Sequence, residues 1–192
     1  MIYLYRRNKT GICIDRVYGH DGIVELPETL EGLPVTELGA YIFSDHIDRG
    51  DLEKCRMSGK FCTEDGLEVQ DEEGMPEMSG NAVQELILPS KLRKVGRYAF
   101  YNCFHLKKLS FGGDLRDVGV GAMTGCHKIE RVTVKTDENG DSCLRDILTE
   151  LPETLRVDMD KNGEQGRFWF PEFFEEGVEN TPARIIERSF FQ

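Results

Sequence analysis

The side chains best suited to metal or acid-base chemistry are few in this sequence and have few partners. His105 and His127 fall near the same position of successive repeats, and a pair of imidazoles could bind a metal ion, but the sequence indicates no third ligand. The chain lacks the Gly-x-Ser-x-Gly, His-Glu-x-x-His and Walker motifs of hydrolases, metalloproteases and nucleotide-binding proteins. We therefore predict that the protein is not an enzyme and has no catalytic residue, metal site or cofactor.

One short run resembles a calcium-binding loop. From Asp158 to Gly163 the chain reads Asp-Met-Asp-Lys-Asn-Gly, which matches the first six positions of an EF-hand. The twelfth position would be Trp169, which cannot supply the carboxylate that this loop requires. The pair Asn162-Gly163 between two apolar segments equally describes a β-hairpin turn. We favour the hairpin over a calcium site.

The elements that would carry any functional side chain follow a repeating pattern between Val83 and Val134. The period is about 23 residues, and positions that keep both their spacing and their chemistry are typical of a solenoid, in which each unit stacks on its neighbours. The clearest matches, from one unit to the next, are Leu88, Gly96, Ala99 and Cys103 with Phe111, Gly119, Ala122 and Cys126.

Each unit is predicted to contain one short strand and one return segment. Leu109 and Phe111 alternate with polar residues, which indicates a strand with one buried face. The closer apolar spacing over residues 115–123 indicates a tight turn and a short helical segment. Small side chains at Gly119 and Ala122 should let the outer segments of neighbouring coils approach closely.

The six cysteines are interpreted from their spacing. Cys103 and Cys126 occupy the same repeat position, which favours buried thiols. Stacked rungs lie about 4.8 Å apart, so distance alone does not exclude a disulfide between them. Cys55 and Cys62 have no nearby histidines at zinc-finger spacing, which argues against a zinc site.

The unit from Leu86 to Cys103 closely resembles the BspA-like leucine-rich repeat family, a group of bacterial repeat proteins. The family pattern is a strand, Leu-Pro, Leu-x-x-Ile-Gly-x-x-Ala-Phe and then a small residue or Cys. An earlier copy runs from Ile23 to Phe43 with an insertion around 31–35. The resemblance implies a right-handed α/β solenoid of short parallel strands with irregular or short helical returns. It also implies proteins that bind partners without catalysis, many of them surface adhesins.

The predicted organisation is a solenoid over residues 1–160 and a C-terminal cap or docking segment over 161–192. Residues 44–82 contain 11 Asp and Glu against 4 Lys and Arg, and glycines interrupt them. We interpret this stretch as an acidic loop inserted in the solenoid, or as a degenerate repeat. Aromatic residues crowd the start of the C-terminal segment, where they could close the open end of the coil.

Charge and hydropathy restrict the class of partner. The net charge of -11 argues against nucleic acid or an anionic membrane as the partner. No stretch approaches the roughly 20 apolar residues that cross a bilayer. The first twelve residues do not have the pattern of a secretory signal. We therefore expect a cytoplasmic protein, or a secreted or cell-surface one if an N-terminal signal was removed.

The predicted function is binding of a protein or peptide partner through the exposed face of the strands. The alternative is a surface adhesin that binds a host protein or glycan, and self-association through the acidic or aromatic segments is a further possibility. The predicted binding residues form two parallel files, Ile23, Glu85, Lys108 and Arg131 in one and Glu25, Ile87, Ser110 and Thr133 in the other. Their mixed polarity favours a protein or peptide over an apolar small molecule.

Overall fold

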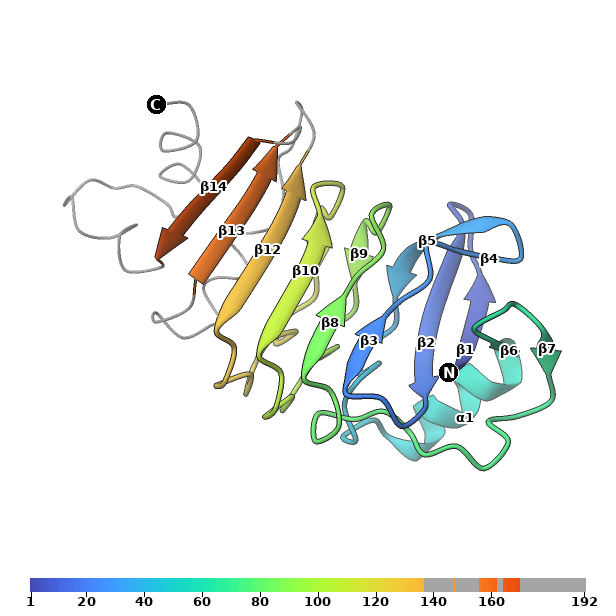
Figure 1. The fold of residues 1–192 in the computed structure, drawn as a ribbon. Helices are drawn as coiled ribbons and strands as arrows, with labels where there is room; N and C mark the ends of the chain where they lie inside the picture. Colours follow the sequence, from blue (N-terminus) through green and yellow to red (C-terminus); the bar gives the residue numbers. More distant parts are fainter. Residues whose placement is uncertain (137–146, 148–155, 162–163, 170–192) are drawn as a thin grey trace.

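The computed structural model describes residues 1–136, 147, 156–161 and 164–169, and it shows a coil with two sheets (Figure 1). The first sheet, here called the strand sheet, contains five parallel strands and one antiparallel strand at its end. In spatial order they are β3 (Ile23–Glu25), β8 (Glu85–Ile87), β10 (Lys108–Gly112), β12 (Arg131–Thr136), β13 (Arg156–Lys161) and β14 (Glu164–Trp169).

The register of the strand sheet follows the sequence repeat. Leu109 of β10 pairs with Leu86 of β8 on one side and with Val132 of β12 on the other. All three side chains are buried, whereas the residues beside them in each strand point away from the core. The predicted parallel stacking of equivalent positions is therefore confirmed.

The second sheet, here called the return sheet, carries the chain back to the next coil. It contains β5 (Leu33–Leu38), β9 (Lys94–Val95) and β11 (Asp117–Val118), which pair in parallel from coil to coil. The prediction of a short helix within 115–123 is wrong, because β11 and turns fill that stretch. Gly121 has a φ of +68°, which is incompatible with a right-handed helix. The repeat region is thus a β-solenoid.

Neighbouring coils contact each other backbone to backbone on the return side. A Cβ atom at Gly96 would lie 2.5 Å from the Ala40 nitrogen, and one at Gly119 would lie 2.3 Å from the Arg97 nitrogen. Ala122 is fully buried. The predicted need for a small residue is confirmed at Gly119, since no larger side chain fits this separation.

The space between the two sheets holds one continuous apolar core. Leucines and valines from the strand sheet meet side chains from the return segments. Phe43 stacks on Phe100 of the next coil, with ring centroids 6.1 Å apart and planes inclined by 24°. The core therefore runs along the coil axis, as expected for units that stack only on their neighbours.

The segment predicted as an acidic loop is an ordered cap on the first coil, so that prediction is corrected. It contains α1 (Arg49–Ser58), β6 (Lys60–Thr63) and β7 (Glu68–Val69). The degenerate-repeat alternative is not supported either, because β6 runs antiparallel to β1 (Ile2–Arg7) and joins the return sheet. The cap also includes β2 (Ile12–Tyr18), while the short strand β4 (Thr29–Leu30) pairs with β5.

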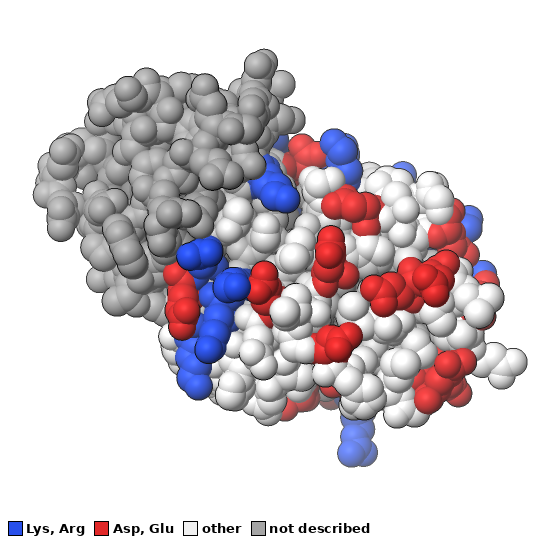
Figure 2. Space-filling model, in the orientation of Figure 1, with Lys and Arg blue, Asp and Glu red and all other residues white. Residues whose placement is uncertain are grey.

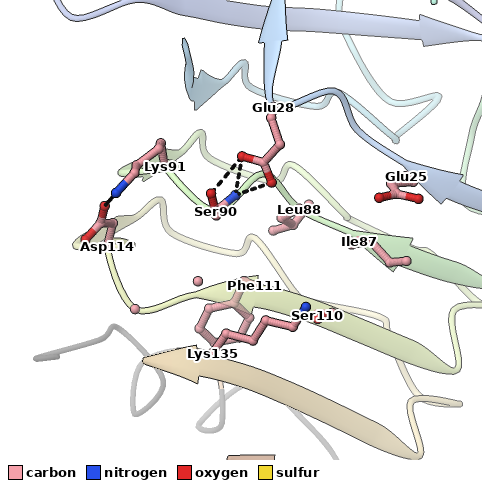
Figure 3. Close-up of a pocket in the computed structure, with 12 residues that line it drawn as sticks. Glu25, Glu28, Ile87, Leu88, Ser90, Lys91, Ser110, Phe111, Asp114 and Lys135 are labelled. Atoms are coloured by element: carbon pink, nitrogen blue, oxygen red, sulfur yellow. Dashed lines mark hydrogen bonds and ion pairs between the residues drawn. The ribbon is translucent and has the colours of Figure 1, made fainter. Parts of the chain in front are cut away.

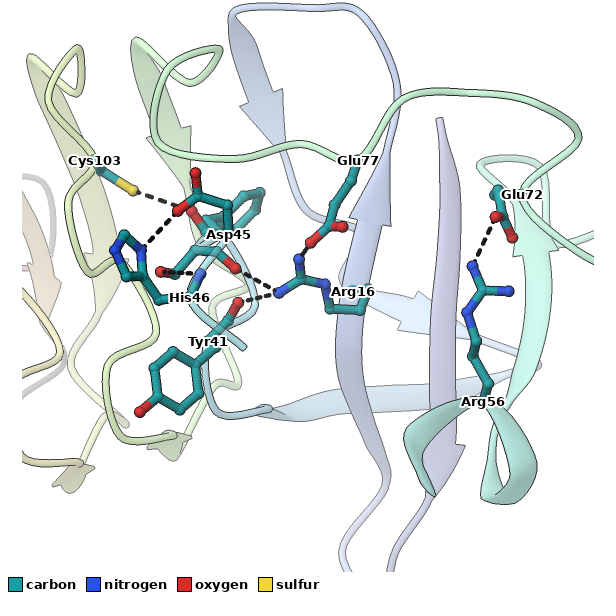
Figure 4. A network of polar contacts seen from close by, with 10 residues as sticks. Arg16, Tyr41, Asp45, His46, Arg56, Glu72, Glu77 and Cys103 are labelled. Atoms are coloured by element: carbon teal, nitrogen blue, oxygen red, sulfur yellow. Dashed lines mark hydrogen bonds and ion pairs between the residues drawn. The ribbon is translucent and has the colours of Figure 1, made fainter. Parts of the chain in front are cut away.

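A buried arginine ties this cap to the first coil (Figure 4). Arg16 of β2 is fully buried. Its guanidinium donates to the carbonyl oxygens of Tyr41 and Ser44, the latter at 3.0 Å, and forms an ion pair with Glu77 at the end of the inserted segment. Burial lowers the pKa of Arg16 to about 10, so the side chain is still charged at neutral pH.

The end of the described chain is a hairpin. β13 and β14 pair antiparallel, and Lys161 lies opposite Glu164, which confirms the predicted hairpin. The Asn162-Gly163 pair of the calcium-like run and residues 170–192 of the predicted aromatic cap lie outside the described residues. No helix in the described part of the chain is long and apolar enough to cross a membrane.

The backbone contact between coils predicts a large effect of one methyl group. Replacing Gly119 with Ala should lower the free energy of unfolding by about 1–3 kcal/mol, because the coil must open locally to admit the Cβ atom. Chemical denaturation measures this change. Val120→Ala is the control, since Val120 is 70% exposed. Equal midpoints for the two variants would show that the coils do not pack as described.

The buried ion pair predicts a second effect on stability. Replacing Glu77 with Gln should destabilise the protein by about 2–4 kcal/mol, because it leaves the buried Arg16 charge without its counter-ion. Glu68→Gln is the matched control, because Glu68 pairs with Lys60 at 3.0 Å on the exposed surface of the same segment. It should cost under about 1 kcal/mol. Similar losses for both variants in thermal denaturation would contradict the role assigned to Arg16.

Candidate partner-binding surface

The two predicted files of residues lie side by side on the outer surface of the strand sheet, here called the strand face. In the first file Glu85 pairs with Ile23 and Lys108, and Lys108 pairs with Arg131. The second file is in register in the same way and contains Glu25, Ile87, Ser110 and Thr133. The structure therefore brings all eight predicted residues together on one surface.

Solvent reaches the rungs formed by β3, β8, β10 and β12. Ile23 is 62% exposed at the first strand. Glu25 and Lys108 are also exposed, whereas Ile87 and Ser110 are half-buried. A surface of this kind mixes apolar, charged and hydroxyl groups in rows that lie about 4.8 Å apart. Such a mixture is typical of the surfaces by which proteins bind other proteins.

One ion pair crosses the strand face between neighbouring rungs. The Lys108 ammonium lies 3.0 Å from the Glu85 carboxylate. The return sheet has an equivalent pair, in which Lys94 lies 3.7 Å from Asp117. Exposed pairs of this kind contribute only about 0–1 kcal/mol to stability. Their charges therefore remain available to a partner with little consequence for the fold.

Charge changes sign along the strand face. Glu25, Glu28 and Glu85 belong to the first two rungs, whereas Lys108, Arg131 and Lys135 belong to the later ones. Figure 2 shows basic residues gathered beside the grey atoms and acidic residues spread over the N-terminal coils. A partner that spans β3 to β12 would thus meet acidic groups first and basic groups later. The next strand, β13, again has acidic positions, because Asp158 and Asp160 lie opposite Thr133 and Lys135 in register.

A groove with a volume of about 230 Å³ lies where the strands of this sheet end (Figure 3). Three apolar residues line it, namely the half-buried Ile87 and the buried core residues Leu88 and Phe111. Gly112 and Gly113 also line it, and they add no side chain to the space. The groove is therefore continuous with the strand face, and its base is less polar than that face.

The walls of the groove are held by polar contacts. The Glu28 carboxylate accepts hydrogen bonds from the Ser90 hydroxyl at 2.7 Å and from the Ser90 backbone nitrogen at 2.9 Å. Lys91 lies 3.6 Å from Asp114 at the rim. These contacts join the turns that follow β3, β8 and β10 at the rim of the groove.

The groove adds residues that the strand pattern did not predict, above all Glu28, Phe111 and Lys135. Only Glu25, Ile87 and Ser110 of the predicted files line it. The available signal was the Leu-Pro dipeptide after β3 and β8, which ends each strand at the same height. Turn residues that follow aligned strand ends must meet at one edge of the sheet.

The remaining chemical candidates are not assembled into a site. Cys103 and Cys126 are buried free thiols, as predicted. A hydrogen bond to Cys126 and burial raise the pKa of Cys103. Burial also raises the pKa of Cys62 to about 11.

His105 and His127 are exposed. Within the described residues, no group of three or more His, Cys, Asp or Glu side chains could hold a metal ion.

Comparison with known families supports the repeat assignment. The family model described as a BspA type leucine rich repeat region of six copies matches residues 78–148. Among solved structures, the crystal structure of a T. pallidum leucine rich repeat protein is similar, with 18% sequence identity, 83% of each chain covered and a TM-score of 0.35. No curated protein matches the chain.

The matched segment contains β8 to β12, and these strands show the register expected of the repeat. The earlier strand β3 continues the same sheet on the N-terminal side. The family match agrees with the pattern of Leu, Gly, Ala-Phe and Cys found in the sequence. Residues 78–148 of this chain thus match the BspA type leucine-rich repeat family, in agreement with the resemblance found in the sequence.

Proposed function

We propose that this protein is an interaction module that binds a protein or peptide partner through the strand face, without catalysis. The observation that carries the proposal is the in-register ladder of mixed polarity across β3, β8, β10 and β12. Leucine-rich repeat proteins are generally protein-interaction modules, which supports this assignment. The partner would lie across the rungs and contact side chains from several coils.

The energetics of the strand face agree with this role. Its aliphatic side chains Ile23 and Ile87 offer apolar area, and burying such area is the main favourable contribution to association. Charged neighbours add selectivity and accelerate association more than they add affinity. The repeated geometry lets one surface present both kinds of group at regular spacing, as an extended or helical partner segment requires.

Reversal of one charge on the strand face tests the proposal. Lys108→Glu should weaken capture of the partner from a lysate about five- to tenfold, because it replaces an attractive contact with a repulsive one. Quantitative mass spectrometry of proteins retained by the immobilised chain provides the measurement. Thermal denaturation confirms that the variant is folded.

Lys94→Glu is the matched control on the opposite sheet. Both lysines pair with a carboxylate at the equivalent position of an adjacent coil, so each substitution creates the same like-charge contact. The control should retain every protein that the unmodified chain retains. If the two variants lose the same proteins, or if neither loses any, the strand face is not the binding surface.

A further inference from the structure

We propose that the groove at the ends of β3, β8, β10 and β12 binds an extended peptide segment of mixed charge. This segment would carry a basic side chain, an apolar side chain two residues away and an acidic side chain two residues further. The inference rests on the proposed function, because it specifies the chemistry of the partner that the strand face and its groove would bind.

The apolar part of the groove suits the central side chain of such a segment. Ile87 is half-buried at the groove, and Leu88 and Phe111 line its base with side chains that belong to the core. Figure 3 labels these three side chains at the ends of β8 and β10. Gly112 and Gly113 also line the groove and add no side chain to it. A volume of about 230 Å³ accommodates one aliphatic side chain and the backbone on either side of it.

The end of the groove near the N-terminal coils is acidic. Glu25 is exposed, and no ion pair neutralises it within the part of the chain that the structure describes. Glu28 stands nearby, where its carboxylate is oriented by Ser90. A neutral hydrogen-bond donor such as Ser90 does not cancel the negative charge of Glu28. A Lys or Arg side chain of a partner would therefore be attracted to this end.

The opposite end of the groove is basic. Lys135 of β12 is exposed. No ion pair joins it to another described side chain, and Asp160 of β13 lies opposite it in the strand register. Lys91 does not extend this positive end, because Asp114 lies 3.6 Å from its ammonium group. The polarity of the groove thus runs from Glu25 and Glu28 to Lys135, and an acidic side chain of a partner would be attracted to the Lys135 end.

The distance between the two ends determines the spacing of the charges in the partner. Three rungs and two residues along the strand separate Glu25 from Lys135. With about 4.8 Å per rung and about 3.3 Å per residue, this corresponds to roughly 16 Å. An extended peptide covers about 13 Å in four residues, and two side chains reach the remainder. The basic and acidic residues of the partner are therefore expected four positions apart.

The test uses three synthetic peptides with blocked ends and glycine flanks. Their central sequences are Lys-Ala-Leu-Ala-Glu, Lys-Ala-Leu-Ala-Lys and Glu-Ala-Leu-Ala-Glu, and fluorescence anisotropy measures their binding to the full chain. The mixed peptide should bind about fivefold more tightly than either of the others, since each like-charge contact costs of the order of an exposed ion pair.

A charge-reversal variant makes the test specific to the groove. With Lys135→Glu the preference should change to the Lys-Ala-Leu-Ala-Lys peptide, because both ends of the groove are then acidic. Lys128→Glu is the control, since Lys128 is exposed just before the same strand and does not line the groove. It should preserve the preference for the mixed peptide.

Several outcomes would overturn the inference. These are equal binding of the three peptides, no binding of any of them at millimolar concentration, and the same change of preference in Lys128→Glu as in Lys135→Glu. The proposed function is tested separately by Lys108→Glu, because Lys108 does not line the groove. If Lys108→Glu loses a partner while the peptides do not discriminate, the strand face binds its partner and the groove does not.

Discussion

Successive coils touch backbone to backbone at Gly96 and Gly119, where a Cβ atom would lie 2.5 and 2.3 Å from the neighbouring chain. This separation holds the short return strands in parallel register. Because core side chains of the two sheets pack against each other and protein interiors are close-packed, the same spacing is imposed on the strand sheet. The ladder of the strand face and the alignment of the strand ends at the groove both depend on this contact.

A stack of identical units leaves an apolar surface open at each end. At the N-terminal end the open surface is covered by β1, β2, β6 and α1. Here β1 pairs antiparallel with β2 and β6, whereas the strands of the repeat pair in parallel. Arg16 connects this cap to the first coil through two carbonyl oxygens and Glu77. One terminal nitrogen donates to the two carbonyl oxygens and the other forms the ion pair with Glu77, which offsets part of the cost of burial. The buried Nε has no hydrogen-bond partner among the described residues.

The repeats could be predicted from the sequence and the cap could not, for a physical reason. The repeat shows the same local pattern at a fixed interval, so strand positions, buried faces and register followed from the period alone. The cap gave no such signal. Helix α1 buries no residue completely, β6 buries only Phe61 and Cys62, and its pairing partner β1 lies at the start of the chain, far from it in sequence. Local composition therefore resembled that of a loop.

The sequence by itself determined the solenoid, the parallel register and the eight side chains of the strand face, because each depends on spacing along the chain. The tertiary structure alone decided that the returns contain no helix between 115 and 123, that the acidic segment folds as a cap, and that Glu28, Phe111 and Lys135 line one groove. These features arise where residues of different coils or of distant segments meet. Such contacts depend on how the coils stack, which the local sequence does not specify.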